Sequence, residues 1–440
     1  MDKLLLVLLA LPVAAAAASY YWGETRATLS LRLSIVTALI LAALTISRAM
    51  VDLAFALPAG RELLLTPIAQ LGVQLLALMM LGLTLSMRDA DPSLVASWLP
   101  VAWLSTAGLS LALLVSSLPL AVLAFVGAAL IWAFGLPESQ RSASSASVLR
   151  YSALLALSMP LLMISFLLAE QRTTATPDLE QVALSLAVPA FGLLLGLIPL
   201  HAWALTLASG TPRAMLFGVV GLVQTSGFAL LLRALASSGY PWLMEPSRAL
   251  LILGGSLSML LGGWLALSAR LDDPDDFLVY AIVGNTGLLL AGLGANSAAA
   301  GAGLALLLVA RVLALVILAM APRVSGGYRR SAYALGILAL AGTPGLAGFP
   351  GFWLILRRIG SGGPNLAQVA LLAGSGMLFA TAIRRWRYDA ESGAPDADDS
   401  PQARRLVVTL ALLLVVLGLA PHVIAPAFTG ALRGMYFVNP

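Results

Sequence analysis

The sequence predicts an all-α integral membrane protein with about fourteen transmembrane helices. Of its 440 residues, 60% are hydrophobic and only 10% are charged, whereas soluble domains are about 45–50% apolar and about 25% charged. The apolar residues form long unbroken runs, not the alternating segments of about ten residues that a membrane β-barrel requires. At about 20 residues per helix, the chain accommodates roughly 13–15 spans. This composition excludes a soluble enzyme and a disordered chain.

Fourteen apolar runs mark the expected helices. In chain order they are 3–19, 31–57, 63–86, 98–116, 118–136, 150–169, 182–203, 212–236, 248–268, 277–293, 298–321, 332–357, 366–383 and 405–428. Charged segments or segments rich in Gly and Pro separate most of them. The first run is followed by AAAAAS, which resembles a signal-peptide cleavage site. Because residues 1–3 carry little net positive charge, we expect a retained helix.

The distribution of Lys and Arg predicts the orientation, because short cytoplasmic loops carry an excess of these residues. Of the 25 Lys and Arg residues, Arg311 lies in mid-span and fifteen others lie on one side. The opposite side carries the remaining nine: Lys3, Arg48, Arg61, Arg172, Arg233, Arg248, Arg357, Arg358 and Arg433. We therefore expect a multi-pass protein of a bacterial-type inner (plasma) membrane with both termini outside.

Proline and glycine interrupt two of the expected helices in mid-run. Helix 7 contains Pro199 within GLLLGLIPLHAW, and helix 12 contains Pro344 and Pro350 within AGTPGLAGFPGFW. Proline removes a backbone donor and clashes with the preceding turn, so both helices should be broken. Broken helices at corresponding positions of two halves are typical of inverted-repeat transporters, although membrane helices also tolerate isolated Gly and Pro.

The two breaks lie five helices apart, which suggests two inverted five-helix repeats. The backbone groups freed at each break must then be buried in protein or face a water-filled cavity. The expected parts of the chain are 1–97 for helices 1–3, 98–236 for the first repeat (helices 4–8), 248–383 for the second repeat (helices 9–13) and 405–440 for helix 14 with the carboxyl terminus.

The scarcity of Cys and His limits the chemistry of the chain. With no Cys and two His, it has no ligands for a disulfide, a thiolate-bound cluster or a multi-His metal site. We therefore expect no catalytic residue, no metal and no cofactor in this chain. Arginines in short loops explain the net charge of +5, so the expected partner is the lipid bilayer and not a nucleic acid.

Several motifs, in consistent order over about residues 100–390, resemble the antiporter-like membrane subunits of respiratory complex I. The same family includes Mrp-type sodium/proton antiporters and subunits of membrane-bound hydrogenases. The matching segments are SSASVLRY at 144–151, PLHAW at 199–203 (the family's PFHxW), GTP at 210–212, QTSGFA at 224–229 (KAAGFA), VYAIVGNTG at 279–287 (AYSSIAHAG) and LALAGTPGLAGFPGFWL at 338–354 (SLAGIPPLAGFFGKFY).

The resemblance implies a proton path that buried Glu, Lys and His residues join across the membrane. This sequence departs from the family at those positions. The Glu of helix 5 falls within 125–129, FVGAA, and the Lys residues of helices 7 and 8 are Leu194 and Gln224. The family's IAHAG His is Asn285, and its charged residue in helix 12 is Phe352. Leu and Phe cannot carry a proton, and Gln and Asn cannot hold its charge.

Four interior polar residues remain as candidates for a proton path or for structural contacts: His201, Gln224, Asn285 and Arg311. Arg311 lies deep in an apolar run, where a charge costs at least about 2.5–3.5 kcal/mol. It could be a functional charge, or it could bind backbone carbonyls or a carboxylate. His201 could line the interior or bond to a carbonyl freed at the break.

The resemblance implies an antiporter-like subunit of a complex I-like NADH–quinone oxidoreductase or a related proton-translocating complex. Its partners would be other membrane subunits, which would carry the redox centres. The missing charges leave open a rebuilt proton path or a degenerate scaffolding role. The alternatives are an Mrp-like cation/proton antiporter, which needs ion-coupling residues that this chain largely lacks, and a membrane subunit coupled to hydrogenase or inorganic-carbon chemistry.

Overall fold

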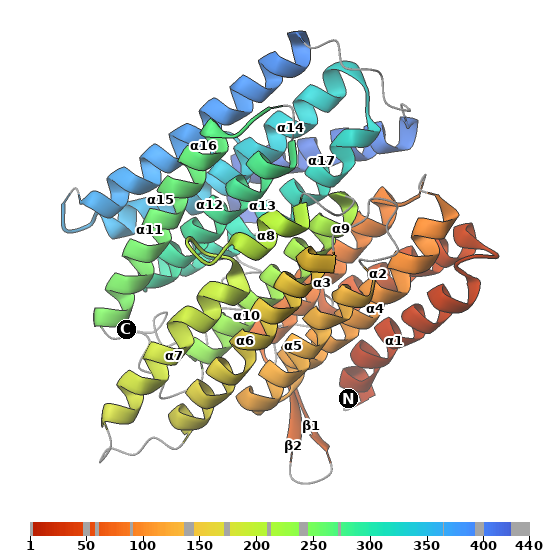
Figure 1. Cartoon of the computed structure of the whole chain (residues 1–440), viewed down its shortest axis with the longest axis horizontal. Coiled ribbons are helices and arrows are strands. Elements are labelled where there is room, and N and C mark those ends of the chain that lie inside the picture. The colour runs from red at the N-terminus through yellow and green to blue at the C-terminus, as the bar shows by residue number, and fades with distance from the viewer. Residues whose placement is uncertain are drawn as a thin grey trace. The chain divides into compact units, whose positions relative to one another are not determined.

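The computed structural model describes residues 3–46, 53–57, 61–88, 91–135, 145–170, 177–208, 213–236, 245–271, 274–363, 365–391 and 400–423. Over these ranges the chain is almost entirely helical, and it divides into two compact units (Figure 1). The first unit comprises Met1–Gly196 and Ala202–Trp242, and the second comprises Leu197–His201 and Leu243–Pro440.

The helices of the two units follow the predicted order. In the first unit they are α1 (Lys3–Trp22), α2 (Ala27–Ile46), α3 (Pro67–Ser86), α4 (Pro92–Leu114), α5 (Leu118–Gly135), α6 (Ser145–Glu170), α7 (Pro177–Leu195), α8 (Ala202–Ala208), α9 (Arg213–Gly218), a π-helical segment (Val219–Gln224) and α10 (Thr225–Ala236). In the second unit they are α11 (Glu245–Ser268), α12 (Pro274–Gly294), α13 (Ala298–Met320), α14 (Gly326–Ala341), α15 (Gly348–Ile359), α16 (Leu366–Glu391) and α17 (Pro401–Leu419).

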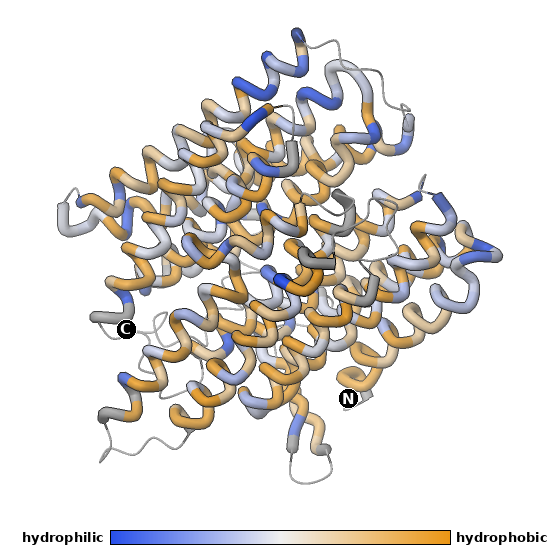
Figure 2. Tube along the Cα trace, in the orientation of Figure 1, coloured by the Kyte–Doolittle hydropathy of each residue, from blue (hydrophilic) through white to orange (hydrophobic). Residues whose placement is uncertain are grey.

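The helical membrane fold is confirmed. Within the described ranges, 11 helices are long and apolar enough to cross a membrane, judged by length and composition. Figure 2 shows hydrophobic residues along the helices and hydrophilic residues mainly near their ends. Each of the fourteen predicted runs overlaps a helix or a broken pair of helices, while the number of spans stays a prediction.

Three helices begin with the same local sequence signal, a polar residue followed by proline. Thr66, Asp91 and Ser400 cap α3, α4 and α17, and each side chain accepts a hydrogen bond from a backbone N–H of the first turn. Proline follows each cap at the first helical position, where its missing N–H has no helical partner to lose. These starts are therefore determined locally.

The prediction of a helix over 31–57 is wrong at its carboxyl end. α2 ends at Ile46, and two antiparallel strands, β1 (Leu53–Leu57) and β2 (Arg61–Leu65), follow it. Periodicity does not distinguish a strand from a helix in such short apolar runs. Pro58 and Gly60, which favour turns, separate the two strands in the sequence.

The hairpin also pairs with a distant part of the first unit. Ser116 N donates to Glu62 O at 2.9 Å, and Leu63 forms an isolated β-bridge with Val115. Both partners belong to the connection between α4 and α5. The second strand therefore has backbone partners on both of its edges, and only the folded chain supplies them.

The prediction that helices 7 and 12 are broken is confirmed. α7 ends at Leu195 and α8 begins at Ala202, while α14 ends at Ala341 and α15 begins at Gly348. Gly342 adopts a left-handed conformation with φ of 70° at the end of α14, which glycine adopts without a steric penalty. The predicted repeat boundaries stay a prediction.

Arg233, in the last turn of α10, caps the carboxyl end of α4. The side chain is 8% exposed. Its Nη1 donates to the carbonyls of Ala112 (2.9 Å) and Leu113 (3.2 Å), and its Nη2 donates to those of Val115 and Ser116. The last carbonyls of a helix lack intrahelical donors and carry partial negative charge, so a cation stabilises them.

Replacing Arg233 by Met should destabilise the first unit. Met keeps an apolar stem but leaves buried carbonyls unsatisfied, so we expect a loss of at least about 1–3 kcal/mol of unfolding free energy. Thermal denaturation of the purified protein in detergent measures this as a lower melting temperature. Arg88→Met is the control, because Arg88 is exposed; equal melting temperatures for the two variants would contradict the capping role.

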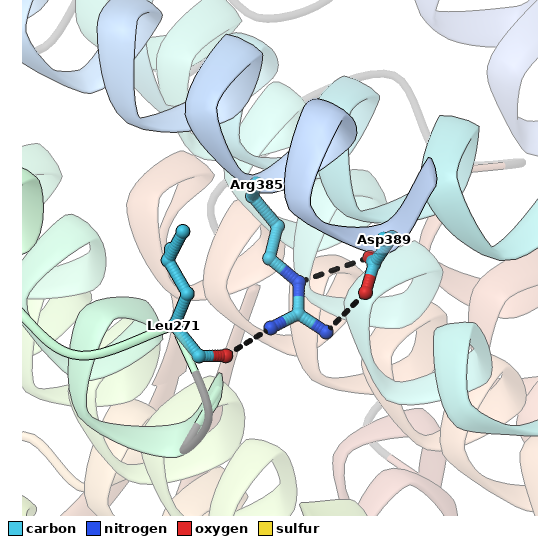
Figure 3. A network of polar contacts seen from close by, with 3 residues as sticks. All are labelled: Leu271, Arg385 and Asp389. Carbon is cyan, nitrogen blue, oxygen red and sulfur yellow. Dashed lines mark hydrogen bonds and ion pairs between the residues drawn. The ribbon is translucent and has the colours of Figure 1, made fainter. Parts of the chain in front are cut away.

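A buried ion pair holds the end of α16. Arg385 Nε donates to Asp389 Oδ2 at 3.0 Å and Arg385 Nη2 lies 2.7 Å from Asp389 Oδ1, while Nη1 donates to the carbonyl of Leu271 (Figure 3). The guanidinium carbon lies 5.0–5.5 Å from the ring centroids of Phe277, Tyr333 and Tyr388. These contacts explain why α16 continues to Glu391, beyond the predicted end at 383.

Removing the carboxylate of this pair should be strongly destabilising. Asp389 is 4% exposed, and breaking a buried ion pair from one side costs about 3–5 kcal/mol. Asp389→Ala should therefore lower the melting temperature far more than Glu391→Ala, which removes an exposed carboxylate from the same helix end. A similar small decrease in both variants would show that the pair contributes little.

Candidate functional site

The site in the first unit begins at the end of α7. A continuing helix would bond the Leu195 carbonyl to the N–H of residue 199, but Pro199 has no N–H. The side chain of Gln224 supplies the missing donor: its Nε2 lies 3.0 Å from Leu195 O. Gln224 is 2% exposed, so its amide satisfies a buried backbone oxygen that proline leaves without a helical partner.

Gly196 allows this arrangement. It has φ of 63°, a conformation that side chains other than Gly rarely adopt. A Cβ at this position would lie 3.3 Å from both Gln224 Nε2 and Trp203 Cζ2. Trp203 Nε1 in turn donates to Leu193 O at 2.8 Å. Two side chains from later in the chain thus bond to the last turn of α7.

Gln224 is the last residue of the π-helical segment that joins α9 to α10. π-helical turns are rare and frequently lie at functional positions. Here the segment is entirely buried.

Two hydrocarbon side chains of the first unit pack on the same glycine. Leu194 and Phe125 both lie against Gly227 of α10, because a Cβ on Gly227 would overlap Leu194 Cδ2 and lie 3.3 Å from Phe125 Cζ. Both side chains are fully buried. The folded chain therefore brings Leu194, the expected position of a family lysine, close to Phe125, the first residue of the stretch 125–129 in which the family's glutamate is expected. Neither side chain can take up a proton.

In the second unit, too, an amide side chain donates to a carbonyl at the end of a broken helix. The Leu340 carbonyl would bond to the N–H of residue 344 in a continuing helix, and that residue is Pro344. Asn285 Nδ2, from α12, donates to Leu340 O at 2.8 Å. Ser375 of α16 donates its hydroxyl to the adjacent Ala341 O at 2.7 Å. Side chains from two other helices thus bond to the carboxyl end of α14.

Arg311 binds the other side of the Asn285 amide. It lies in the middle of α13 and is 1% exposed. Its Nη1 donates to Asn285 Oδ1 at 2.8 Å, to Thr286 Oγ1 at 3.1 Å and to Ile282 O at 3.4 Å. These three acceptors are neutral oxygens of α12. A chain of polar contacts therefore runs from Arg311 through Asn285 to the broken helix.

Phe352 and Pro350 belong to the helix that follows the break. A Cβ on Gly342 would lie 2.8 Å from Phe352 Cβ, so Phe352 packs directly on the turn that ends α14. Pro350 lies in the first turn of α15, where its missing N–H has no helical partner to lose. The expected charged position of helix 12 is thus an apolar contact.

His201 lies at the end of the first break and belongs to the second unit. Its ring centroid lies 5.8 Å from that of Tyr280 of α12. Of the four predicted interior polar residues, the structure brings Asn285 and Arg311 into direct contact. Gln224 belongs to the first unit, and His201 contacts another residue of α12.

Sequence reasoning missed the side chains that complete these contacts: Trp203, Thr286 and Ser375. The carbonyl four residues before a proline loses its helical donor, and this signal marks Leu195 and Leu340. It does not mark Leu193 and Ala341, the partners of Trp203 and Ser375. Among the described residues, the buried charged side chains are those of Arg233, Arg311, Arg385 and Asp389. The same part of the chain contains no group of three His, Cys, Asp or Glu residues that could hold a metal ion.

The described residues form a many-helix membrane fold with two broken helices, and an amide side chain bonds to the last turn before each break. The chain is 28% identical over 264 residues to NADH-quinone oxidoreductase subunit 14 of Thermus thermophilus, covering 57% of this chain and 59% of that protein. It is 30% identical over 277 residues to subunit 13 of the same organism, covering 56% and 57%. The matches thus span less than two thirds of these relatives. No family model matches the chain.

Solved structures show the same fold over nearly the whole chain. A chain of respiratory complex I from Thermus thermophilus matches with a TM-score of 0.78 and 21% identity, over 96% of this chain and 99% of that one. A chain of the Mrp complex from Dietzia sp. DQ12-45-1b matches with a TM-score of 0.81 and 15% identity, over 99% and 97%. A chain of an archaeal membrane-bound sulfane sulfur reductase matches with a TM-score of 0.82 and 15% identity, over 98% of each.

The amide of Gln224 should be needed for stability. Gln224→Met keeps the side-chain length but removes the donor to Leu195 O, so we expect a loss of about 1–3 kcal/mol of unfolding free energy. Gln181→Met is a matched control, because Gln181 lies exposed on α7. Thermal denaturation in detergent compares them. A Gln224→Met protein as stable as the control would show that the bond contributes nothing.

Proposed function

We propose that the chain is an antiporter-like subunit of the membrane arm of a complex I-like NADH–quinone oxidoreductase or a related redox-linked complex. Within it, the chain supports the assembly and does not conduct protons along the family's axis. Similarity to NADH-quinone oxidoreductase subunits over more than half of the chain supports the first part. Redox chemistry would belong to partner subunits.

The proposal that the chain does not conduct protons rests on which charged residues are buried. A proton path through a membrane protein needs buried groups that take up and release protons. Among the described residues, the buried charges are three arginines and one aspartate. Arginine does not release its proton near neutral pH, and Asp389 is paired with Arg385.

The amides at the expected charge positions support the same conclusion. Gln224 and Asn285 each donate to a carbonyl that a proline leaves without its helical partner. An amide side chain can bridge polar groups but cannot hold a proton's charge. The two residues therefore have a structural function that accounts for their burial. The shared fold with a chain of an Mrp complex keeps an Mrp-like antiporter as the competing assignment.

The proposal also includes the orientation of the chain in the membrane. The excess of Lys and Arg on one side supports an inner-membrane protein with both termini outside. Reporter fusions at each terminus would test this directly.

Purification under mild conditions tests the assignment. We expect the tagged protein, extracted in mild detergent, to co-purify with quinone-reductase and iron–sulfur subunits identified by mass spectrometry. We also expect the isolated chain to add no proton or sodium flux to liposomes, because the buried charged residues in the described ranges are three arginines and an aspartate paired with one of them. Purification alone, together with ion flux in liposomes, would overturn the proposal and favour an independent antiporter.

A further inference from the structure

The end of α14 is a place that attracts a cation. The carboxyl end of a helix carries about half a negative charge, and the break after Ala341 removes helical partners from its last carbonyls. Side chains bond to three of them: Thr343 to Leu338 O, Asn285 to Leu340 O and Ser375 to Ala341 O. In transporters, the carboxyl ends of broken helices coordinate Na⁺ or H⁺.

The guanidinium of Arg311 already lies close to the carboxyl end of α14. The Arg311 guanidinium is separated from Leu340 O by one amide: Arg311 Nη1 lies 2.8 Å from Asn285 Oδ1, and Asn285 Nδ2 lies 2.8 Å from Leu340 O. The hydroxyl of Thr286 and the carbonyl of Ile282 bind the same Nη1. Contacts to α12 therefore hold the guanidinium next to the break.

The directions of these hydrogen bonds oppose proton transfer. A guanidinium only donates and a carbonyl only accepts, so the Asn285 amide must turn its oxygen to Arg311 and its nitrogen to Leu340. Neither Arg311 nor Asn285 takes up and releases a proton near neutral pH. A proton that entered this row would meet the positive charge of Arg311, and neither of these two side chains would carry it further.

We propose that Arg311 is a tethered cation that closes the second unit to protons. It occupies the electrostatic position that a transported cation would otherwise take at the end of α14, as a fixed arginine excludes protons from other membrane pores. The inference rests on the proposed non-conducting role and adds a reason for it. With this charge in place, the polar groups at the break after Ala341 do not let protons pass.

Proton leak through liposomes that contain the full-length protein tests this barrier. A pH-sensitive dye inside the vesicles reports proton entry driven by a potassium diffusion potential. We expect the unmodified protein to match protein-free vesicles, and Arg311→Gln to raise the leak about tenfold or more, equivalent to about 1.4 kcal/mol of barrier. Arg311→Lys, which keeps the charge, should stay close to the unmodified protein.

Arg387→Gln is the matched control, because it removes an exposed arginine of the same unit and should leave the leak unchanged. Asn285→Asp provides a second test that keeps Arg311: a carboxylate beside Nη1 neutralises its charge, so the leak should also rise. Each variant is compared only as monodisperse protein with an unchanged helical circular dichroism spectrum.

The outcomes separate this inference from the proposed function. A tight unmodified protein with folded but equally tight Arg311→Gln and Asn285→Asp variants would overturn the barrier role and leave the non-conducting assignment intact. A leaky unmodified protein would overturn both. A leak that rises in Arg311→Gln and returns to baseline in Arg311→Lys would support the tethered cation.

Discussion

A carbonyl oxygen freed inside a bilayer finds no water there, so the protein itself must supply its donor. The interior of this chain is organised around that requirement. Gln224 bonds to Leu195 O and Asn285 to Leu340 O, in each case four residues before a proline. The guanidinium of Arg233 likewise donates to the carbonyls at the end of α4, so a cation takes the part that an amide takes elsewhere. These three polar side chains thus lie where the backbone lacks helical partners.

The same requirement can be met without charged residues. A lysine and an amide both donate a hydrogen bond, but only the lysine carries a titratable proton. Gln224, at the position expected for a family lysine, donates to Leu195 O and carries no titratable proton. Leu194 and Phe352 keep the volume of their positions and pack on Gly227 and Gly342. Structural support and proton conduction can therefore be separated within one architecture.

The two units differ in what remains at their broken helices. In the first, Phe125 and Leu194 both pack on Gly227, three residues after the bonded Gln224. In the second, a polar row of Thr286, Arg311 and Asn285 reaches the end of α14. An apolar contact blocks a proton by excluding water, whereas a polar row can block it only by charge and by the direction of its hydrogen bonds. Arg311 provides both.

Composition and proline placement determined the membrane class, the helix order and the two breaks, because hydrophobic runs and missing N–H groups act locally. Motif spacing also singled out Leu194, Gln224, Asn285 and Phe352 as residues to examine. The tertiary structure alone decided what these residues do: Gln224 meets a carbonyl 29 residues earlier in the chain, and Asn285 meets one 55 residues later. It also decided the hairpin after α2, which pairs with residues beyond α4, and the buried Arg385–Asp389 pair. Such contacts depend on which distant segments become neighbours, and local periodicity carries no record of that.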